Sequence, residues 1–202
     1  MTTDDPVRII ADLFEGEGAA DYLGEAVSQA AHMLQAAALA EADSAGPALI
    51  AAALLHDVGH FTGAVSGPEL MRGTDNKHSD AGAQWLAQWF GEDVTEPIRL
   101  HVAAKRYLCA TEPGYAATLS DASVYTLGVQ DGPMHGAELA EFEAGRHAQA
   151  AVRVRRWDDA AKDPDAAVPG FGYYEPHRAS ARPARPGCRR MRPTACPRSP
   201  AR

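Results

Sequence analysis

The sequence predicts an all-α fold, a bundle of roughly five to seven helices packed around one core. Apolar residues recur at helical spacing along several stretches of the chain. Proline and glycine residues stand where those stretches begin and end, as is typical of helix boundaries. No convincing pair of β-strand patterns occurs in the 202 residues, so the all-α class follows.

The first half of the chain predicts three helices. A short helix is expected around Pro6–Phe14, and the apolar spacing over about Glu25–Ala42 indicates a longer one. Pro47–Asp57 is the third, because proline suits the first turn of a helix and Gly59 suits its end. This stretch is apolar nearly all round, so we expect it to be buried.

The second half predicts further helices after a glycine-rich loop over residues 62–76. The expected ranges are His78–Phe90, Val94–Lys105, Ala116–Leu127 and a long amphipathic stretch, Gly136–Lys162. Pro97 is compatible with its helix only if it lies in the first turn. Pro164 ends whatever remains of the last helix.

The chain divides into a domain over residues 1–177 and a tail over residues 178–202. The tail contains eight arginines, several prolines and no acidic residue. It has almost no large apolar side chains, so we expect it to be disordered. It is either a dispensable extension or a basic segment for an anionic partner.

Charge and cysteine content exclude several classes of protein. The net charge is −8, and residues 1–177 carry 11 basic and 27 acidic residues, a balance of −16 that disfavours nucleic acid as a partner. No apolar run reaches the roughly 20 residues that span a membrane. The start, MTTDDPVRII, lacks the features of a signal peptide. Three cysteines, without a leader, do not indicate a disulfide framework. A soluble, cytoplasmic protein is expected.

Histidine and aspartate residues recur on most of the predicted core helices. In chain order they are His32, His56, Asp57, His78 and His101, followed by Asp158 or Asp159. A single histidine on an apolar helix is usually a hydrogen-bonded core residue, but several buried imidazoles would each need a separate partner. Shared metal ions satisfy all of them at once. Imidazole and carboxylate ligands without a thiolate suit iron, manganese or zinc.

The order of these residues, with the adjacent pair in LLHDVGHF at residues 54–61, resembles the H…HD…D pattern of the HD-domain superfamily. The resemblance implies an HD-domain helical bundle. Its four ligands would hold one metal ion and are here His32, His56, Asp57 and Asp158. Two further histidines, His78 and His101, make a second site, with Asp57 bridging both ions. Asp158 is preferred to Asp159 by its spacing in the family pattern.

Two segments carry a narrower resemblance. YLGEAVSQAAHMLQ at residues 22–35, together with AAALLHDVGHF at residues 51–61, closely resembles the phosphonate-cleaving HD oxygenases. The likeness extends from about Tyr22 to His177. It implies two iron ions, Fe(II)/Fe(III), and the use of O2 to cleave a carbon–phosphorus bond. The implied substrates are 2-amino-1-hydroxyethylphosphonate or its N-trimethyl analogue, with phosphate and glycine or glycine betaine as products.

The same resemblance implies roles for residues outside the ligand set. A tyrosine that caps the open iron and a glutamate that closes over the substrate amine correspond to Tyr22 and Glu25. Substrate-binding residues correspond to His60, Lys105, Ser123 and Arg155, of which His60 joins Tyr22 and Glu25 as a catalytic candidate. Without the resemblance, Tyr22 and Glu25 could simply begin a helix, with Glu25 in the first turn. Lys105 could equally be a solvated surface lysine.

Two other functions remain open from the residues alone. Most HD domains are phosphohydrolases, in which metal ions activate water for attack on phosphorus. A non-catalytic binding or regulatory HD domain is the third possibility, although the complete ligand set argues against it. The run Gln130-Asp131-Gly132-Pro133 departs from the Gln-Gly-Gly-Pro common in the oxygenases, which leaves the substituent on the substrate open.

Overall fold

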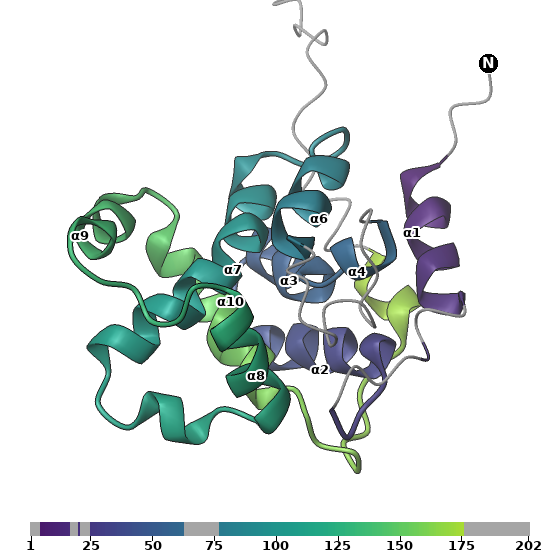
Figure 1. The fold of residues 1–202 in the computed structure, drawn as a ribbon. Coiled ribbons are helices and arrows are strands. Elements are labelled where there is room, and N and C mark those ends of the chain that lie inside the picture. Colours follow the sequence, from purple (N-terminus) through teal and green to yellow (C-terminus); the bar gives the residue numbers. More distant parts are fainter. Residues whose placement is uncertain (1–4, 17–19, 21–24, 63–76, 176–202) are drawn as a thin grey trace, which may run out of the picture.

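The computed structural model describes residues 5–16, 20, 25–62 and 77–175 (Figure 1). Every regular element in these ranges is helical. The α-helices are α1 (Pro6–Glu15), α2 (Gln29–Ala42), α3 (Pro47–Leu55), α4 (Gly59–Thr62), α6 (His78–Leu86), α7 (Glu92–Thr111), α8 (Asp121–Val129), α9 (Ala137–Ala144) and α10 (Ala148–Ala160). Two 3-10 helices, Tyr115–Thr118 and Phe171–Tyr174, lie between and after them. The predicted all-α class is confirmed. Tyr22, the tail over residues 178–202 and, apart from Thr62, the loop over residues 62–76 lie outside the described residues.

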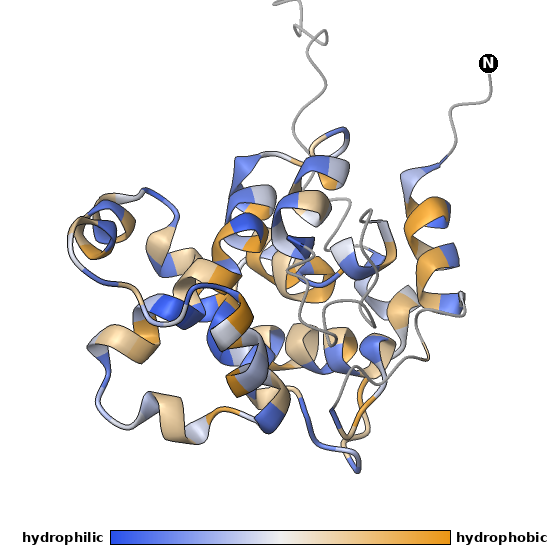
Figure 2. Ribbon diagram, viewed as in Figure 1, coloured by the Kyte–Doolittle hydropathy of each residue, from blue (hydrophilic) through white to orange (hydrophobic). Residues whose placement is uncertain are grey.

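The core is built around α3, which packs against α2, α7 and α10 (Figure 1). Leu54, Leu55 and Val58 are completely buried there, as the uninterrupted apolar sequence of this helix predicts. Outer helices bury one side only. Hydrophobic and hydrophilic residues alternate along the turns of α1 (Figure 2), which buries Ile10 in the core. Within the described ranges, no helix is both long and apolar enough to cross a membrane.

The start of α2 differs from the prediction. Ser28 caps this helix, and its hydroxyl accepts a hydrogen bond from the backbone N–H of Ala31 at 3.3 Å. The helix therefore begins at Gln29, and Glu25 lies in a bend before it. The alternative in which Glu25 occupies the first helical turn is wrong.

The long helix expected over Gly136–Lys162 is also wrong, because the chain breaks it into α9 and α10. Gly145 adopts an extended conformation after α9, and its N–H donates to the carbonyl of Phe142 at 3.0 Å. Phe142 and Ala148 both pack in a second small core, beside Met134. Glycine costs a helix about 1 kcal/mol relative to alanine, so packing decides the break. As a result α10 lies against α7, α2 and α3.

Two backbones meet closely where α4 packs on α6. A Cβ atom on Gly59 would lie 1.9 Å from the carbonyl oxygen of His78 and 2.9 Å from the backbone nitrogen of Gly82. Gly59 was expected to end the preceding helix, but it begins α4. The contact holds the first residue of α6 beside the turn that follows α3, and that residue is His78.

Pro97 lies in the second turn of α7 rather than the first, since α7 begins at Glu92. A proline at this position cannot donate to the carbonyl of Asp93, four residues earlier. Asp93 is exposed, so water can reach that carbonyl. The helix continues to Thr111, six residues past the predicted end, and both His101 and Lys105, which lie within the predicted range, are buried.

Candidate metal centre

Five helices bring the candidate metal ligands to one place. His32 lies on α2, His56 and Asp57 follow α3, His78 begins α6, His101 is in the middle of α7, and Asp158 is near the end of α10. All six are buried, and Asp57 is the most exposed at 9%. Buried ionisable groups persist in proteins when they are paired or bind metal, so this gathering calls for a chemical partner.

The ligand atoms form two clusters that share Asp57. Within the described part of the chain, the donor atoms of His32, His56 and Asp57 lie within 4.8 Å of one another, and so do those of Asp57, His78 and His101. One carboxylate oxygen, Oδ2, is 3.8 Å from His32 Nε2 and 3.6 Å from His56 Nε2. The other, Oδ1, is 3.4 Å from His78 Nε2 and 3.6 Å from His101 Nε2. Asp57 can therefore bridge two ions.

The hydrogen bonds of the rings show which nitrogen atoms are available as ligands. Nδ1 of His32, His56 and His101 lies 2.8, 2.8 and 2.7 Å from the carbonyl oxygens of Ala161, Ala53 and Ile98. A carbonyl only accepts, so each Nδ1 donates and each neutral ring keeps a lone pair on Nε2.

Those lone pairs converge. His32 Nε2 is 3.1 Å from His56 Nε2, and His78 Nε2 is 3.1 Å from His101 Nε2. His32 and His56 cannot hydrogen-bond to each other while both rings are neutral and donate through Nδ1. A cation between the rings resolves the conflict. The donor set thus fits a pair of metal ions, and it contains imidazole and carboxylate but no thiolate.

Electrostatics keep most of the site in a ligating state. Burial lowers the pKa of His101 to about 4, and burial together with His60 holds the pKa of His78 well below its ordinary value. Burial alone would raise the pKa of Asp57, but attraction to His56, His60 and His78 holds it well below the ordinary range. For His32, burial is the largest single influence and lowers the pKa, but the hydrogen bond and charge of Asp158, the charge of Asp57 and the hydrogen bond to Ala161 together raise it above its ordinary value.

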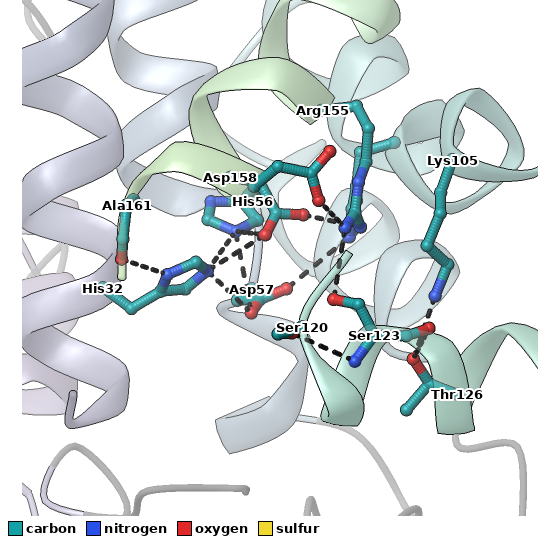
Figure 3. Close-up of polar contacts among 12 residues, drawn as sticks. His32, His56, Asp57, Lys105, Ser120, Ser123, Thr126, Arg155, Asp158 and Ala161 are labelled. Atoms are coloured by element: carbon teal, nitrogen blue, oxygen red, sulfur yellow. Dashed lines mark hydrogen bonds and ion pairs between the residues drawn. The ribbon is translucent and has the colours of Figure 1, made fainter. Parts of the chain in front are cut away.

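The two adjacent aspartates of α10 point to different partners. Asp158 Oδ1 lies 3.3 Å from His32 Nε2, and Asp158 Oδ2 is 2.8 Å from Arg155 Nη1 (Figure 3). Asp159 instead accepts hydrogen bonds from Arg155 and from the hydroxyl of Tyr115. The geometry places Asp158, and not Asp159, beside the histidines.

A pocket of about 80 Å³ opens next to the clusters. It is lined by the candidate ligands other than His56 and by five residues that the resemblance assigned to substrate, namely Glu25, His60, Lys105, Ser123 and Arg155. Lys105 and Arg155 are 2% and 4% exposed, so Lys105 is not a surface lysine. Tyr22 lies outside the described residues, and its place relative to the pocket stays a prediction.

Several lining residues were missed by the sequence reasoning. Gln29 donates from Nε2 to Asp57 Oδ2 at 3.0 Å and lies one helical turn before His32. Lys162 lies 2.6 Å from Glu25 and one turn after Asp158. The remaining missed residues are Val102, Ala122, Thr126 and Gln130. Helical spacing from a ligand could have indicated Gln29 and Lys162, whereas the others carry no comparable signal.

Comparisons with known proteins agree with this geometry. The family model for the HD domain matches residues 30–125. A [1-hydroxy-2-(trimethylamino)ethyl]phosphonate dioxygenase (glycine-betaine-forming) from Leisingera caerulea is 42% identical over 170 residues, which cover 84% of this chain and 87% of that protein. A hydroxymethylphosphonate dioxygenase from Gimesia maris is 43% identical over 174 residues, 86% of each chain. An uncharacterized protein, L432, from Acanthamoeba polyphaga mimivirus is 35% identical over 171 residues, 83% of this chain and 78% of that one.

Proposed function

The chain belongs to the HD-domain family, among its phosphonate-cleaving oxygenases, and on this premise we propose that it uses O2 to cleave the carbon–phosphorus bond of a 1-hydroxyphosphonate. The observation that carries the proposal is the double histidine cluster around Asp57 beside a pocket with buried cations. The candidate substrates are 2-amino-1-hydroxyethylphosphonate and its N-trimethyl analogue, giving phosphate with glycine or glycine betaine. The name of the Gimesia relative adds hydroxymethylphosphonate as a third.

Two iron ions, Fe(II)/Fe(III), are the proposed cofactors. One would be held by His32, His56, Asp57 and Asp158, the other by Asp57, His78 and His101. Bound iron would supply the oxygen chemistry and lower the pKa of the substrate hydroxyl. The second set has fewer protein ligands, so it is the set that leaves room for substrate.

The substrate and O2 together account for every atom and electron of the reaction, so no further reductant is needed. The carbon–phosphorus bond breaks and the hydrogen on C1 is lost from carbon. One atom of O2 ends in the new carboxylate, whose other oxygen is the original hydroxyl. The second atom completes phosphate. The protein's own part is to bind the phosphonate, orient C1 and hold the charges that the products acquire.

Lys105 supports binding of an anion in this pocket. Its Nζ donates to Thr126 Oγ1 at 2.9 Å (Figure 3), and no carboxylate in the described residues lies within ion-pair distance of it. Burial, with Arg155 nearby, lowers the pKa of Lys105 to about 7. A buried ammonium without a counter-ion is unfavourable, and a phosphonate would supply the missing negative charge.

Ser123 supports the same conclusion through the direction of its proton. Its Oγ accepts from Arg155 Nη2 at 3.4 Å (Figure 3) and also from Lys162 Nζ at 3.0 Å. A hydroxyl has two lone pairs and one proton. Since both lone pairs are engaged, the hydroxyl proton is left to donate to a further acceptor. A phosphonate oxygen in the pocket is such an acceptor.

Tyr22, Glu25 and His60 are the proposed catalytic residues. We assign Tyr22 to cap the open iron until substrate arrives, and Glu25 to the end of the substrate away from phosphorus. His60 stacks on His78, with ring centroids 4.2 Å apart, and lines the pocket. This contact supports His60 as a donor to the phosphonate near the second metal ion.

The test is oxygen uptake by iron-loaded protein with each of the three candidate phosphonates, with phosphate measured in the same samples. Substrate-dependent uptake matched one-to-one by phosphate release is the expected result. Release of phosphate from nucleotides or other phosphate esters without oxygen uptake would instead make the protein a phosphohydrolase. Metal analysis after iron-replete expression should find about two iron ions per chain, as a dinuclear carboxylate-bridged site requires.

A further inference from the structure

Lys162 lines the pocket and lies 2.6 Å from Glu25, the carboxylate proposed to face the end of the substrate away from phosphorus. We propose that Lys162 determines specificity by neutralising Glu25, so that the pocket takes a 1-hydroxyphosphonate without a cationic nitrogen in preference to an aminated one. This inference rests on the proposed function and names the substrate class of the same site.

The ammonium of Lys162 is fully engaged. Its Nζ lies 2.6 Å from Glu25 Oε1, 2.8 Å from Ser120 Oγ and 3.0 Å from Ser123 Oγ. These three contacts match the three N–H donors of a lysine. The side chains of Glu25 and Lys162 are only 18% and 15% exposed, so water screens the pair less than it would at the surface.

The carboxylate of Glu25 is likewise occupied by partners within the protein. Its Oε1 also accepts a hydrogen bond from the hydroxyl of Ser120 at 2.7 Å. A substrate ammonium that approached this carboxylate would have to displace Lys162 or lie beside it. Two cations at the same partly buried carboxylate repel each other more strongly than they would in open solvent. The pair therefore disfavours a cationic nitrogen at this position.

The backbone on both sides of Lys162 is anchored by hydrogen bonds, which fixes the point from which its side chain reaches Glu25. The carbonyl of Ala161 accepts the hydrogen bond of His32 at 2.8 Å. Asp163 is fixed by Gln35, whose Nε2 donates to the Asp163 carbonyl at 2.8 Å while its Oε1 accepts from the Asp163 N–H at 3.1 Å. A shift of the backbone at Lys162 would disturb either a proposed metal ligand or this double hydrogen bond, so only the side chain of Lys162 is free to move aside.

The other carboxylates of the pocket offer no alternative site for a cation. Among the described lining residues, Asp158 is paired with Arg155 and His32, and Asp57 lies between the two histidine pairs. Lys105 is the lining cation without a carboxylate partner in that part of the chain. As far as the described residues go, the pocket thus presents an unmatched positive charge for the phosphonate and no unmatched negative charge for an ammonium.

The experiment compares substrates of equal size that differ in charge. Iron-loaded protein is assayed by oxygen uptake with 1-hydroxypropylphosphonate and 2-amino-1-hydroxyethylphosphonate, in which a methyl group replaces an ammonium. We expect kcat/KM for the uncharged member to be at least tenfold higher. Calorimetric titration without oxygen should give a Kd ratio in the same direction, which measures the preference independently of turnover.

Variants test whether Lys162 is the cause. Lys162→Met should shift the kcat/KM ratio at least tenfold towards the aminated substrate, because Glu25 then lacks its internal cation. Lys162→Gln, which keeps hydrogen-bonding capacity, should shift the ratio in the same direction and serves if the Met variant is poorly folded. In the matched control, K162M combined with E25Q, the gain for the aminated substrate should disappear.

The outcomes are separable. A wild-type preference for the aminated phosphonate, or an unchanged ratio in both Lys162 variants, would overturn the inference while leaving the oxygenase intact. Tighter binding of the uncharged phosphonate without any oxygen uptake would support the inference and overturn the proposed reaction. Equal affinity for both phosphonates would overturn the inference whatever the turnover.

Discussion

At the scale of single residues, we expect Lys105 to favour phosphonate binding at the expense of the stability of the folded protein. It is 2% exposed and has only a hydroxyl as its hydrogen-bond partner among the described residues. Lys105→Met should lower kcat/KM for the phosphonate by about 100-fold, the value of a charge-assisted hydrogen bond of roughly 3 kcal/mol. The melting temperature of the substrate-free variant should stay the same or rise, because an uncompensated buried charge is removed. Steady-state kinetics and thermal melts check both parts, and a lower melting temperature would contradict the argument.

The identity of most site residues is readable from the sequence, but their pairings are not. His56 and Asp57 stand out because an imidazole and a carboxylate end an apolar helix, which is a local pattern. The contact of Glu25 with Lys162 joins residues 137 positions apart, and no local pattern encodes it. Asp158 could be told from Asp159 only by family spacing, since both pair with Arg155 and only the structure shows which of them faces His32.

At the scale of elements, the contact between α4 and α6 positions one ligand. Gly59→Ala would put a methyl group 1.9 Å from the His78 carbonyl oxygen, so the start of α6 must move. We expect a loss of about 1–3 kcal/mol in the free energy of unfolding, the usual range for overpacking. Iron content should fall from about two towards about one per chain, because His78 belongs to only one proposed ligand set. Metal analysis and denaturant unfolding measure these changes.

Gly128→Ala in α8 is the matched control for that variant. Nothing lies within 4 Å of a Cβ atom at Gly128, which is exposed. Alanine is a better helix former than glycine by about 1 kcal/mol, so this variant should be as stable as the wild type or more so, with full iron content. A Gly59→Ala protein that behaved like the control would show that the two backbones can separate freely.

Helix boundaries could be predicted where a residue near the boundary determines it. They could not be predicted where contacts with distant parts of the chain determine it. Pro47 marks the start of α3, and the structure begins the helix at that residue. The break between α9 and α10 depends on Phe142 and Ala148 meeting residues from other parts of the chain. The helical pattern of Gly136–Lys162 continues through that break, so periodicity alone joined two helices into one. The same limit explains why more helices are found in the described residues than were expected.

At the scale of the whole molecule, the ligands join helices from both ends of the chain, so metal removal should weaken the entire fold. His32 on α2 contacts Asp158 on α10 at this centre, and His78 and His101 connect α6 with α7 there. A ligand that binds only the folded state stabilises it in proportion to its affinity. Chelator-treated protein should therefore melt at a lower temperature than iron-loaded protein, and equal melting temperatures would argue against a metal held by all of these helices.

Acid should destabilise the metal-free protein further. The pKa values of His60, His78 and His101 are lowered in the fold, that of His101 to about 4, chiefly by burial. In the unfolded chain they return to about 6.5, so below that pH the unfolded state binds more protons and the free energy of unfolding decreases. His32, whose pKa is raised, opposes this trend but is one ring against three. Thermal melts of chelated protein between about pH 7.5 and about pH 4.5 should show a falling melting temperature.

In iron-loaded protein the fall in melting temperature should begin at lower pH, because protons must then compete with metal for the Nε2 atoms of the histidines. A melting temperature that stayed constant or rose on acidification would mean that these histidines are not buried in their neutral form.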